Sequence, residues 1–327
     1  MTQRPPAPTA VPLLVAAGAG ILMPVQALVT AAAAASMGSV LAAALLSQGA
    51  ALGIVLLASV ALPSGRRGWA RVPAVWKERS VPRWFLLSGL VGAFYIVAQA
   101  LSVGTIGLAL FAVAVVATRT LGSIAIDVVG FSPAGRRRMT RQRLAGAGLL
   151  IVGAAVAAAG TGLRARDDPS AWWGLAVAAA AGLFVSFQQS MNSRAGIAYG
   201  ATSTAIAVNY VAGVLGLLAA CGAGVALGAP GVVPEQGPAW WHVLGGPLGI
   251  MFVVVGVTLV PRLGSLLLGI GLVTGQLLGS LLLDLVLAPE RVAAPEVVGT
   301  LITLLAVLVA SWQPGGTPRP RRGPGGH

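Results

Sequence analysis

Polar side chains are rare within the long apolar stretches of this sequence, and those that occur there are its first candidates for chemistry. One stretch contains Gln26, a second contains Gln188, Gln189 and Asn192, and a third contains Arg119. An amide or a guanidinium group in hydrocarbon needs a polar partner. That partner is either a neighbouring helix or a polar molecule in a cavity, and both interpretations stay open. As binding residues, these side chains would suit a small polar or anionic substrate.

Two aspartates end other apolar stretches. Asp127 and Asp284 each complete the sequence Gly-Ser-x-x-x-Asp, at residues 122–127 and 279–284. We favour a structural role, in which each is an interfacial carboxylate that caps a following segment or pairs with a loop arginine. A role in coupling or gating is the alternative.

The composition argues against enzymatic chemistry. The sequence holds two histidines and one cysteine, and its His, Cys, Asp and Glu residues form no cluster with metal-ligand spacing. It has no Gly-Lys-Ser or Gly-Lys-Thr phosphate-binding sequence. We therefore predict no catalytic residues, no metal and no cofactor, and we do not expect an enzyme.

The amino-acid composition is that of a membrane protein. Hydrophobic residues make up 57% of the 327 residues and charged residues only 9%, where soluble proteins carry about 25%. Ten apolar stretches are long enough to cross a bilayer. They lie near 11–34, 39–62, 84–103, 106–128, 143–160, 172–193, 201–227, 240–260, 263–287 and 294–312. We expect an all-α integral membrane fold of ten transmembrane helices, with disordered tails at 1–10 and 313–327, the second of them basic.

The second half of the sequence repeats the first. At a separation of 162 residues, the matches are Gly20 with Gly182, Gln26 with Gln188, Thr30 with Asn192, Gly38 with Gly200 and Ser47 with Asn209. At a separation of 157 residues, they are Gly89 with Gly246, Gly92 with Gly249, Gly107 with Gly264 and the two Gly-Ser-x-x-x-Asp sequences. We therefore predict two five-helix repeats, 11–160 and 172–312, joined by a linker at 161–171.

An odd number of helices per repeat places the two repeats in opposite orientations. If the N-terminus is cytoplasmic, the outer segments contain only Arg164, Arg166 and Arg291, and Arg119 lies within a helix. The other 17 of the 21 lysines and arginines then face the cytoplasm, which follows the positive-inside rule. We predict an inverted repeat with both termini in the cytoplasm, in the cytoplasmic (inner) membrane of a bacterium.

Inverted repeats suit alternating access, because two halves related by an axis in the membrane plane can exchange conformations. We therefore expect a secondary transporter or exporter of small polar metabolites or drugs. A flippase-like translocator of lipids or lipid-linked substrates is the alternative. The basic residues cluster in loops, which indicates membrane lipids as partners and argues against nucleic acid. A small-molecule substrate is the other expected partner, and a monomer and a homo-oligomer both fit.

Three groups of residues carry a family resemblance. They are Gly20 and Gln26, repeated as Gly182, Gln188 and Asn192; then Trp240, Trp241, Gly245, Gly246 and Gly249; and finally Gly275, Gln276, Ser280 and Asp284. In these groups the sequence resembles the YdcZ-like branch of the drug/metabolite transporter (DMT) superfamily, over about 12–312. The resemblance implies an EamA-like fold of ten helices, formed by two fused five-helix units, and implies no cofactor.

The first half departs from this branch at two positions. Thr30 stands where the branch has Asn, and Thr118-Arg119 stands where it has Gly-Gln. If the amide positions contact substrate, the first half determines specificity. The predicted substrate-binding residues are therefore Gln26, Thr30, Arg119, Gln188, Gln189, Asn192 and Gln276, with Asp127 and Asp284 as candidates for coupling or gating.

Overall fold

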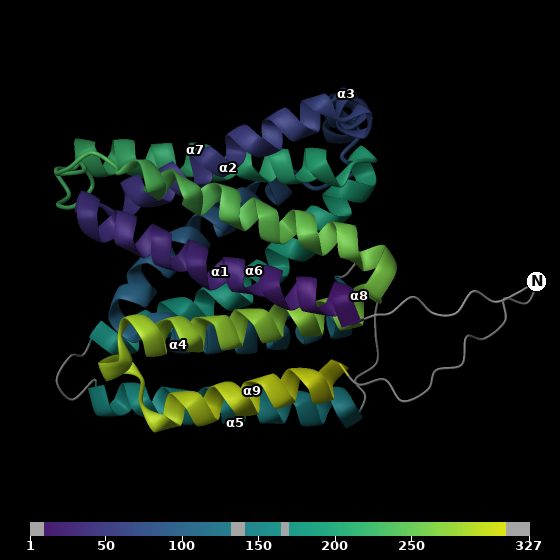
Figure 1. Ribbon diagram of the computed structural model, residues 1–327. Coiled ribbons are helices and arrows are strands. Elements are labelled where there is room, and N and C mark those ends of the chain that lie inside the picture. Colours follow the sequence, from purple (N-terminus) through teal and green to yellow (C-terminus); the bar gives the residue numbers. More distant parts are fainter. Residues whose placement is uncertain (1–9, 132–140, 165–169, 312–327) are drawn as a thin grey trace, which may run out of the picture.

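The computed structural model of this protein describes residues 10–131, 141–164 and 170–311. Within these residues the chain is helical. Its elements are α1 (Ala10–Met37), α2 (Val40–Ala61), α3 (Pro63–Lys77), η1 (Arg83–Leu87), α4 (Ser88–Val129), α5 (Arg141–Arg164), α6 (Ser170–Tyr199), α7 (Thr202–Ala226), η2 (Trp240–Leu244), α8 (Gly245–Leu287), η3 (Pro289–Arg291) and α9 (Ala294–Ser311). Figure 1 shows the long helices side by side in one bundle, with α5 and α9 paired along one edge. The expected tails at 1–10 and 313–327 lie almost wholly outside the described residues.

Helix α4 is a helical hairpin with its turn at Gly107. The backbone there has φ 79° and ψ 172°, a conformation open only to glycine. The rings of Tyr95 and Phe111 lie 6.2 Å apart, although a straight helix would separate these residues by about 24 Å. The two arms, 88–106 and 108–129, match the sequence prediction of separate stretches at 84–103 and 106–128, with the break at Gly107 itself.

Helix α8, the counterpart of α4 in the second half, also turns back at one end of the bundle (Figure 1). Val255 and Leu272 are 17 residues apart, yet they pack in one cluster with Ala16 of α1. The two halves therefore share the same unusual element, a long helical hairpin that packs against the first helix of the other half.

Glycines bring these hairpins into backbone contact with the opposite half. A methyl group on Gly20 of α1 would overlap the backbone of Leu272 and Gln276 in α8. A methyl group on the equivalent Gly182 of α6 would overlap Val115 and Thr118 of α4. Small residues allow such close approach between helices in a membrane, where packing replaces the hydrophobic effect.

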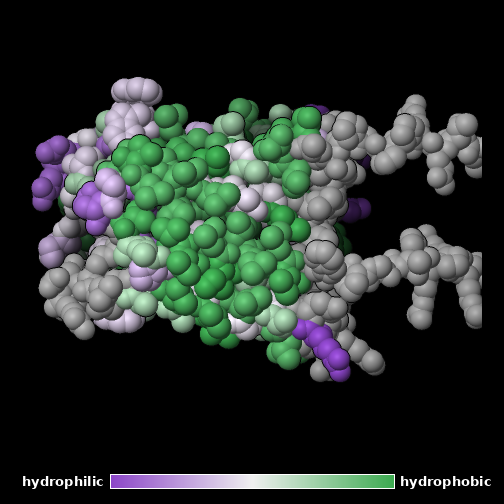
Figure 2. All heavy atoms as spheres, turned by 60° about the horizontal axis from the view of Figure 1, so that its bottom comes forward, coloured by the Kyte–Doolittle hydropathy of each residue, from purple (hydrophilic) through white to green (hydrophobic). Residues whose placement is uncertain are grey.

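The outer surface of the bundle is apolar over a broad area (Figure 2). Ile151 on α5, and Leu301 and Leu305 on α9, are each more than half exposed. Six helices among the described residues are long and apolar enough to cross a membrane, judged by length and composition, and three shorter ones are apolar. The fold is thus all-helical and suited to lipid, and the crossing number of ten stays a prediction.

Helix α3 was not expected, because the sequence between 62 and 84 reads as a charged loop. Its basic side chains are exposed, while the face containing Gly65, Gly68, Val72 and Val75 is buried. This face packs against α6 and α7, where the Thr204 hydroxyl donates a hydrogen bond of 3.1 Å to the carbonyl of Gly65. Tertiary packing therefore forms a helix from a segment whose charges alone indicate solvent.

The turn of α4 gives a first testable prediction. Gly107→Ala should lower the unfolding temperature in detergent, because a side chain in this backbone conformation costs on the order of 1–3 kcal/mol. The added methyl would also meet the Asp284 carboxylate at 3.1 Å. Gly104→Ala, three residues earlier in the same arm, is the control, because a methyl there has no neighbour within 4 Å. Equal unfolding temperatures for the two variants would contradict the assigned turn.

Candidate functional site

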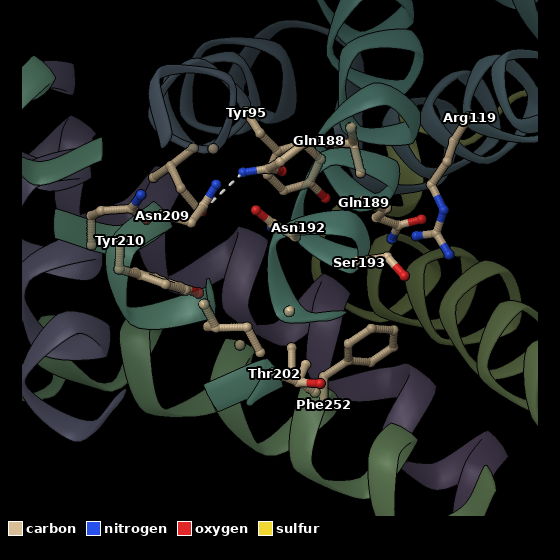
Figure 3. A pocket seen from close by; sticks show the side chains of 18 of the residues that line it. Tyr95, Arg119, Gln188, Gln189, Asn192, Ser193, Thr202, Asn209, Tyr210 and Phe252 are labelled. Atoms are coloured by element: carbon tan, nitrogen blue, oxygen red, sulfur yellow. Dashed lines mark hydrogen bonds between the residues drawn. The ribbon is translucent and has the colours of Figure 1, made fainter. Parts of the chain in front are cut away.

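A pocket of about 620 Å³ lies between the two halves of the bundle. Five predicted binding residues line it, one from each of α1 and α4 and three from α6: Gln26, Arg119, Gln188, Gln189 and Asn192. Figure 3 shows polar side chains of α4, α6 and α7 around the same space. The volume is within the range of small-molecule sites, about 300–1,000 Å³.

Two glutamines at equivalent positions, Gln26 and Gln188, line this pocket, and each lies against a glycine of the opposite half. A methyl on Gly249 of α8 would lie 2.9 Å from Oε1 of Gln26. A methyl on Gly92 of α4 would lie 2.7 Å from Nε2 of Gln188. Each glutamine therefore occupies space left by the glycine of the opposite half, and the repeat explains why both reach the pocket.

The amide of Gln188 belongs to a network that ties three helices together. Its Nε2 donates to the carbonyl of Ser88 at 3.0 Å and to Oδ1 of Asn209 at 3.2 Å, the second bond drawn in Figure 3. Asn209 Nδ2 donates to the Ser88 hydroxyl at 2.8 Å, and that hydroxyl donates to Asn192 at 3.4 Å. Gln188 therefore has the partners on neighbouring helices that one interpretation expects. It also lines the pocket, as the second interpretation, contact with a polar molecule in a cavity, requires.

Arg119 is on the second arm of α4, and its guanidinium points toward Gln189 and Ser193 of α6 (Figure 3). It is partly buried and makes no hydrogen bond or ion pair with any residue of the described ranges. The structural alternative considered from the sequence, a polar partner on a neighbouring helix, is therefore not seen among these residues.

Two predicted binding residues lie elsewhere. Thr30 is buried, and its hydroxyl donates a 2.9 Å hydrogen bond to the carbonyl of Gln26, four residues earlier in α1. Gln276 is 4% exposed and lines a small separate cavity with Tyr95 and Gln99. Both are the repeat counterparts of residues that do line the pocket, Asn192 for Thr30 and Arg119 for Gln276.

Sequence reasoning missed six polar residues that line the pocket: Gln48, Tyr95, Ser193, Thr202, Asn209 and Tyr210. Gln48 of α2 and Tyr210 of α7 occupy equivalent positions in the two halves. All six lie within predicted apolar stretches, so the rarity of polar groups there was the available signal. For Asn209 the match with Ser47 was a second one.

The pocket extends to only one end of the bundle. It reaches Gly200, Ala201 and Thr202, which connect α6 to α7, and we call this the α6–α7 end. Along α6 the lining runs from Val185 to Gly200, about 22 Å of helix.

The equivalent α1–α2 end, around Gly38, is packed shut. Ala34, the counterpart of the lining residue Gly196, is buried in a cluster with Ala100 of α4. The segment before η2 covers the α1–α2 connection, since the Ser39 hydroxyl donates to the carbonyl of Val232 at 2.8 Å. At the pocket wall, equivalent residues differ in exposure, since Gln189 is exposed and its counterpart Ala27 is 1% exposed.

Asp284 caps the broken helix of the opposite half. Its Oδ2 accepts a 2.6 Å hydrogen bond from the backbone N–H of Ala109, directly after the Gly107 turn. The carboxylate is 7% exposed and sits where the N-terminus of the second α4 arm presents unpaired N–H groups. Its counterpart Asp127 is half-buried near the end of α4. Asp284 therefore caps a helix, but the helix belongs to the other half and is not the following segment that the sequence predicted.

One family model matches both halves of the chain, over residues 11–156 and 173–309. The family is described as "Putative inner membrane exporter, YdcZ". The two matched regions together cover most of the sequence and confirm the resemblance and its two-unit form. A comparison with curated proteins found no match.

The hydrogen-bond network at Ser88 gives a second prediction. Ser88→Ala should destabilise the protein by about 1 kcal/mol, because it leaves the buried Asn209 amide without its acceptor. Ser123→Ala is the matched control, since its exposed hydroxyl bonds only to Thr120 in its own helix. Thermal unfolding in detergent would measure both, and a Ser88→Ala variant as stable as Ser123→Ala would contradict the network.

Proposed function

The chain belongs to the YdcZ family of inner membrane exporters, and we propose that it is a secondary transporter that moves small polar metabolites or drugs by alternating access. The observation that supports this most directly is the pocket between the two family units, which receives Gln26 from one unit and Gln188 from the other. A site at the interface of two repeats is where an alternating-access carrier holds its substrate.

We further propose ten membrane crossings in two inverted units. One of the six long apolar helices is 83–129, which contains α4. Because α4 is a hairpin with two arms, it would cross the membrane twice, which makes seven crossings. With the three shorter apolar helices, Leu144–Ala159, Trp240–Val255 and Ala294–Val309, the number becomes ten. Five crossings per unit would invert the second unit, and the positive-inside rule would place both termini in the cytoplasm.

The unequal ends of the pocket support an exchange between two states. Gln189 lines the pocket and is exposed, whereas its counterpart Ala27 is 1% exposed. If the halves exchanged conformations, Ala27 would become accessible and Gln189 buried. With this topology the described state opens toward the cytoplasm.

Paired cysteine variants test this exchange. The one cysteine of the sequence, Cys221, would first be replaced by Ala. In that background, Gln189→Cys should react quickly with a membrane-impermeant maleimide applied from the cytoplasmic side, because Gln189 is exposed in the pocket. Ala27→Cys should react only from the outer side and more slowly, because labelling must wait for the opposite state.

The same experiment can contradict the proposal. Labelling of both positions from the same side would exclude inverted units. If Ala27→Cys never reacts while Gln189→Cys does, the pocket is a fixed cavity and alternating access is wrong.

We propose a gating role for Asp284, because its bond to Ala109 fastens the two units together. Asp284→Ala removes a charged acceptor whose hydrogen bond contributes about 1.5–3 kcal/mol. It should therefore increase outer-side labelling of Ala27→Cys. Asp284→Asn keeps an oxygen that can accept the bond and should change labelling less. Equal labelling in all three backgrounds would leave Asp284 with a capping role only.

A flippase-like translocator is the competing function. A scramblase assay in proteoliposomes separates the two, because a translocator would move fluorescent phospholipid between leaflets. The transporter proposal expects vesicles with and without the protein to give the same rate.

A further inference from the structure

We infer that the substrate is a small organic anion and that Arg119 binds its negative charge. This inference rests on the proposed function, because it names the substrate class of that pocket. Four features carry it: the unpaired Arg119, the chemistry of the other lining residues, the charges at the two ends and the difference between Arg119 and its counterpart.

Arg119 is the first of these features. Its charge lies at the pocket wall in the middle of the bundle, with no hydrogen bond or ion pair to any described residue. A charged side chain at such a depth is costly, and chains retain it where it meets water or a charged ligand. The structure offers the guanidinium no protein partner in the described ranges, so its five donors are free for a ligand from the pocket.

The remaining lining groups do not oppose a negative charge. Among the described residues that line the pocket there is no carboxylate, and the polar ones are amides and hydroxyls. Gln26 and Gln48 are buried, and their side-chain amides make no hydrogen bond within the described residues, so each can donate to a ligand oxygen. Ile96, Val115 and Phe252 provide an apolar wall. A carboxylate or sulfonate on an apolar body matches this combination better than an inorganic ion does.

The two ends of the pathway carry opposite charge. At the α6–α7 end a methyl on Gly200 would lie 2.6 Å from Nη1 of Arg71, an exposed residue of α3. At the α1–α2 end the equivalent Gly38 is contacted by the side chain of Glu235, at 3.2 Å from such a methyl. A positive charge at the open end raises the local concentration of anions. The negative charge at the other end would favour their release.

The counterpart of Arg119 shows why the charge matters for transport. Gln276 occupies the equivalent position in the closed part of the structure and is 4% exposed. If the halves exchange conformations, Arg119 enters an environment of that kind. A bound anion would neutralise it during this step, whereas an empty pocket would bury an unpaired charge at a cost of several kcal/mol. The transition should therefore depend on the bound anion.

Three aromatic probes of similar size test the substrate class: benzenesulfonate is a permanent anion, benzenesulfonamide is neutral and benzyltrimethylammonium is a permanent cation. Equilibrium binding of radiolabelled benzenesulfonate to the purified full chain should be saturable. Benzenesulfonamide and the cation should compete weakly. Arg119→Gln should weaken binding by about tenfold or more, the equivalent of one charge-assisted hydrogen bond. Glutamine is chosen because it is the residue at the equivalent position of the second half, Gln276.

Three further variants separate charge from structure. Arg119→Lys keeps the charge and should retain most binding, so it tests the inference even if Arg119→Gln fails to fold. Arg71→Gln should slow association at low salt with less effect on equilibrium affinity, since it removes steering alone. Arg67→Gln, on the same helix and also exposed, is the control and should change neither.

The outcomes for the inference and for the proposed function are distinguishable. Absence of saturable benzenesulfonate binding, or equal competition by all three probes, overturns the anion assignment. Preferential anion binding that Arg119→Gln abolishes supports it, whether or not flux into proteoliposomes is seen. Flux of the neutral or cationic probe without flux of the anion would keep the transporter and reject the anion. Benzenesulfonate should also accelerate outer-side labelling of Ala27→Cys in the Cys221→Ala background, and not when Arg119→Gln is added.

Discussion

Backbone contact at glycines is the constraint on which the rest of this structure depends. Gly20 and Gly182 let the first helix of each half lie directly on the hairpin of the other half, and Gly92 and Gly249 leave room for the facing glutamine. Larger residues would separate the halves and move Gln26 away from the pocket. In lipid such contacts supply the packing that hydrophobic burial supplies in water. The binding surface is thus assembled by the same contacts that hold the two units together.

The two units share this framework and differ in chemistry. Arg119 lines the pocket, and its counterpart Gln276 is buried in the closed part of the bundle. Arg71 and Glu235 likewise contact equivalent turns with opposite charge. A symmetric framework allows two states of similar energy, and the asymmetric charges would then decide what moves between them. Neither feature alone would make a selective transporter.

The repeat made much of the site predictable from sequence, because equivalent residues meet at the interface of two equivalent units. It identified Gln26, Gln188 and Asn192 as lining residues and placed a break close to Gly107. The repeat could not show that Thr30 and Gln276 lie outside the pocket. In one conformation the pocket opens at one end, so only their counterparts Asn192 and Arg119 line it. Nor could it find α3, whose helical form depends on burial of Gly68 and Val75 against the bundle.

The central claim is that the two ends of the pocket open in turn. Double electron–electron resonance measures it most directly, in a Cys221→Ala background with spin labels on Ile197 and Met251, or on the equivalent pair Ala35 and Phe94. Our account predicts two distance populations for each pair. When benzenesulfonate is added, the population at the longer distance should increase for one pair and decrease for the other. A single unchanged distance in both pairs would contradict it.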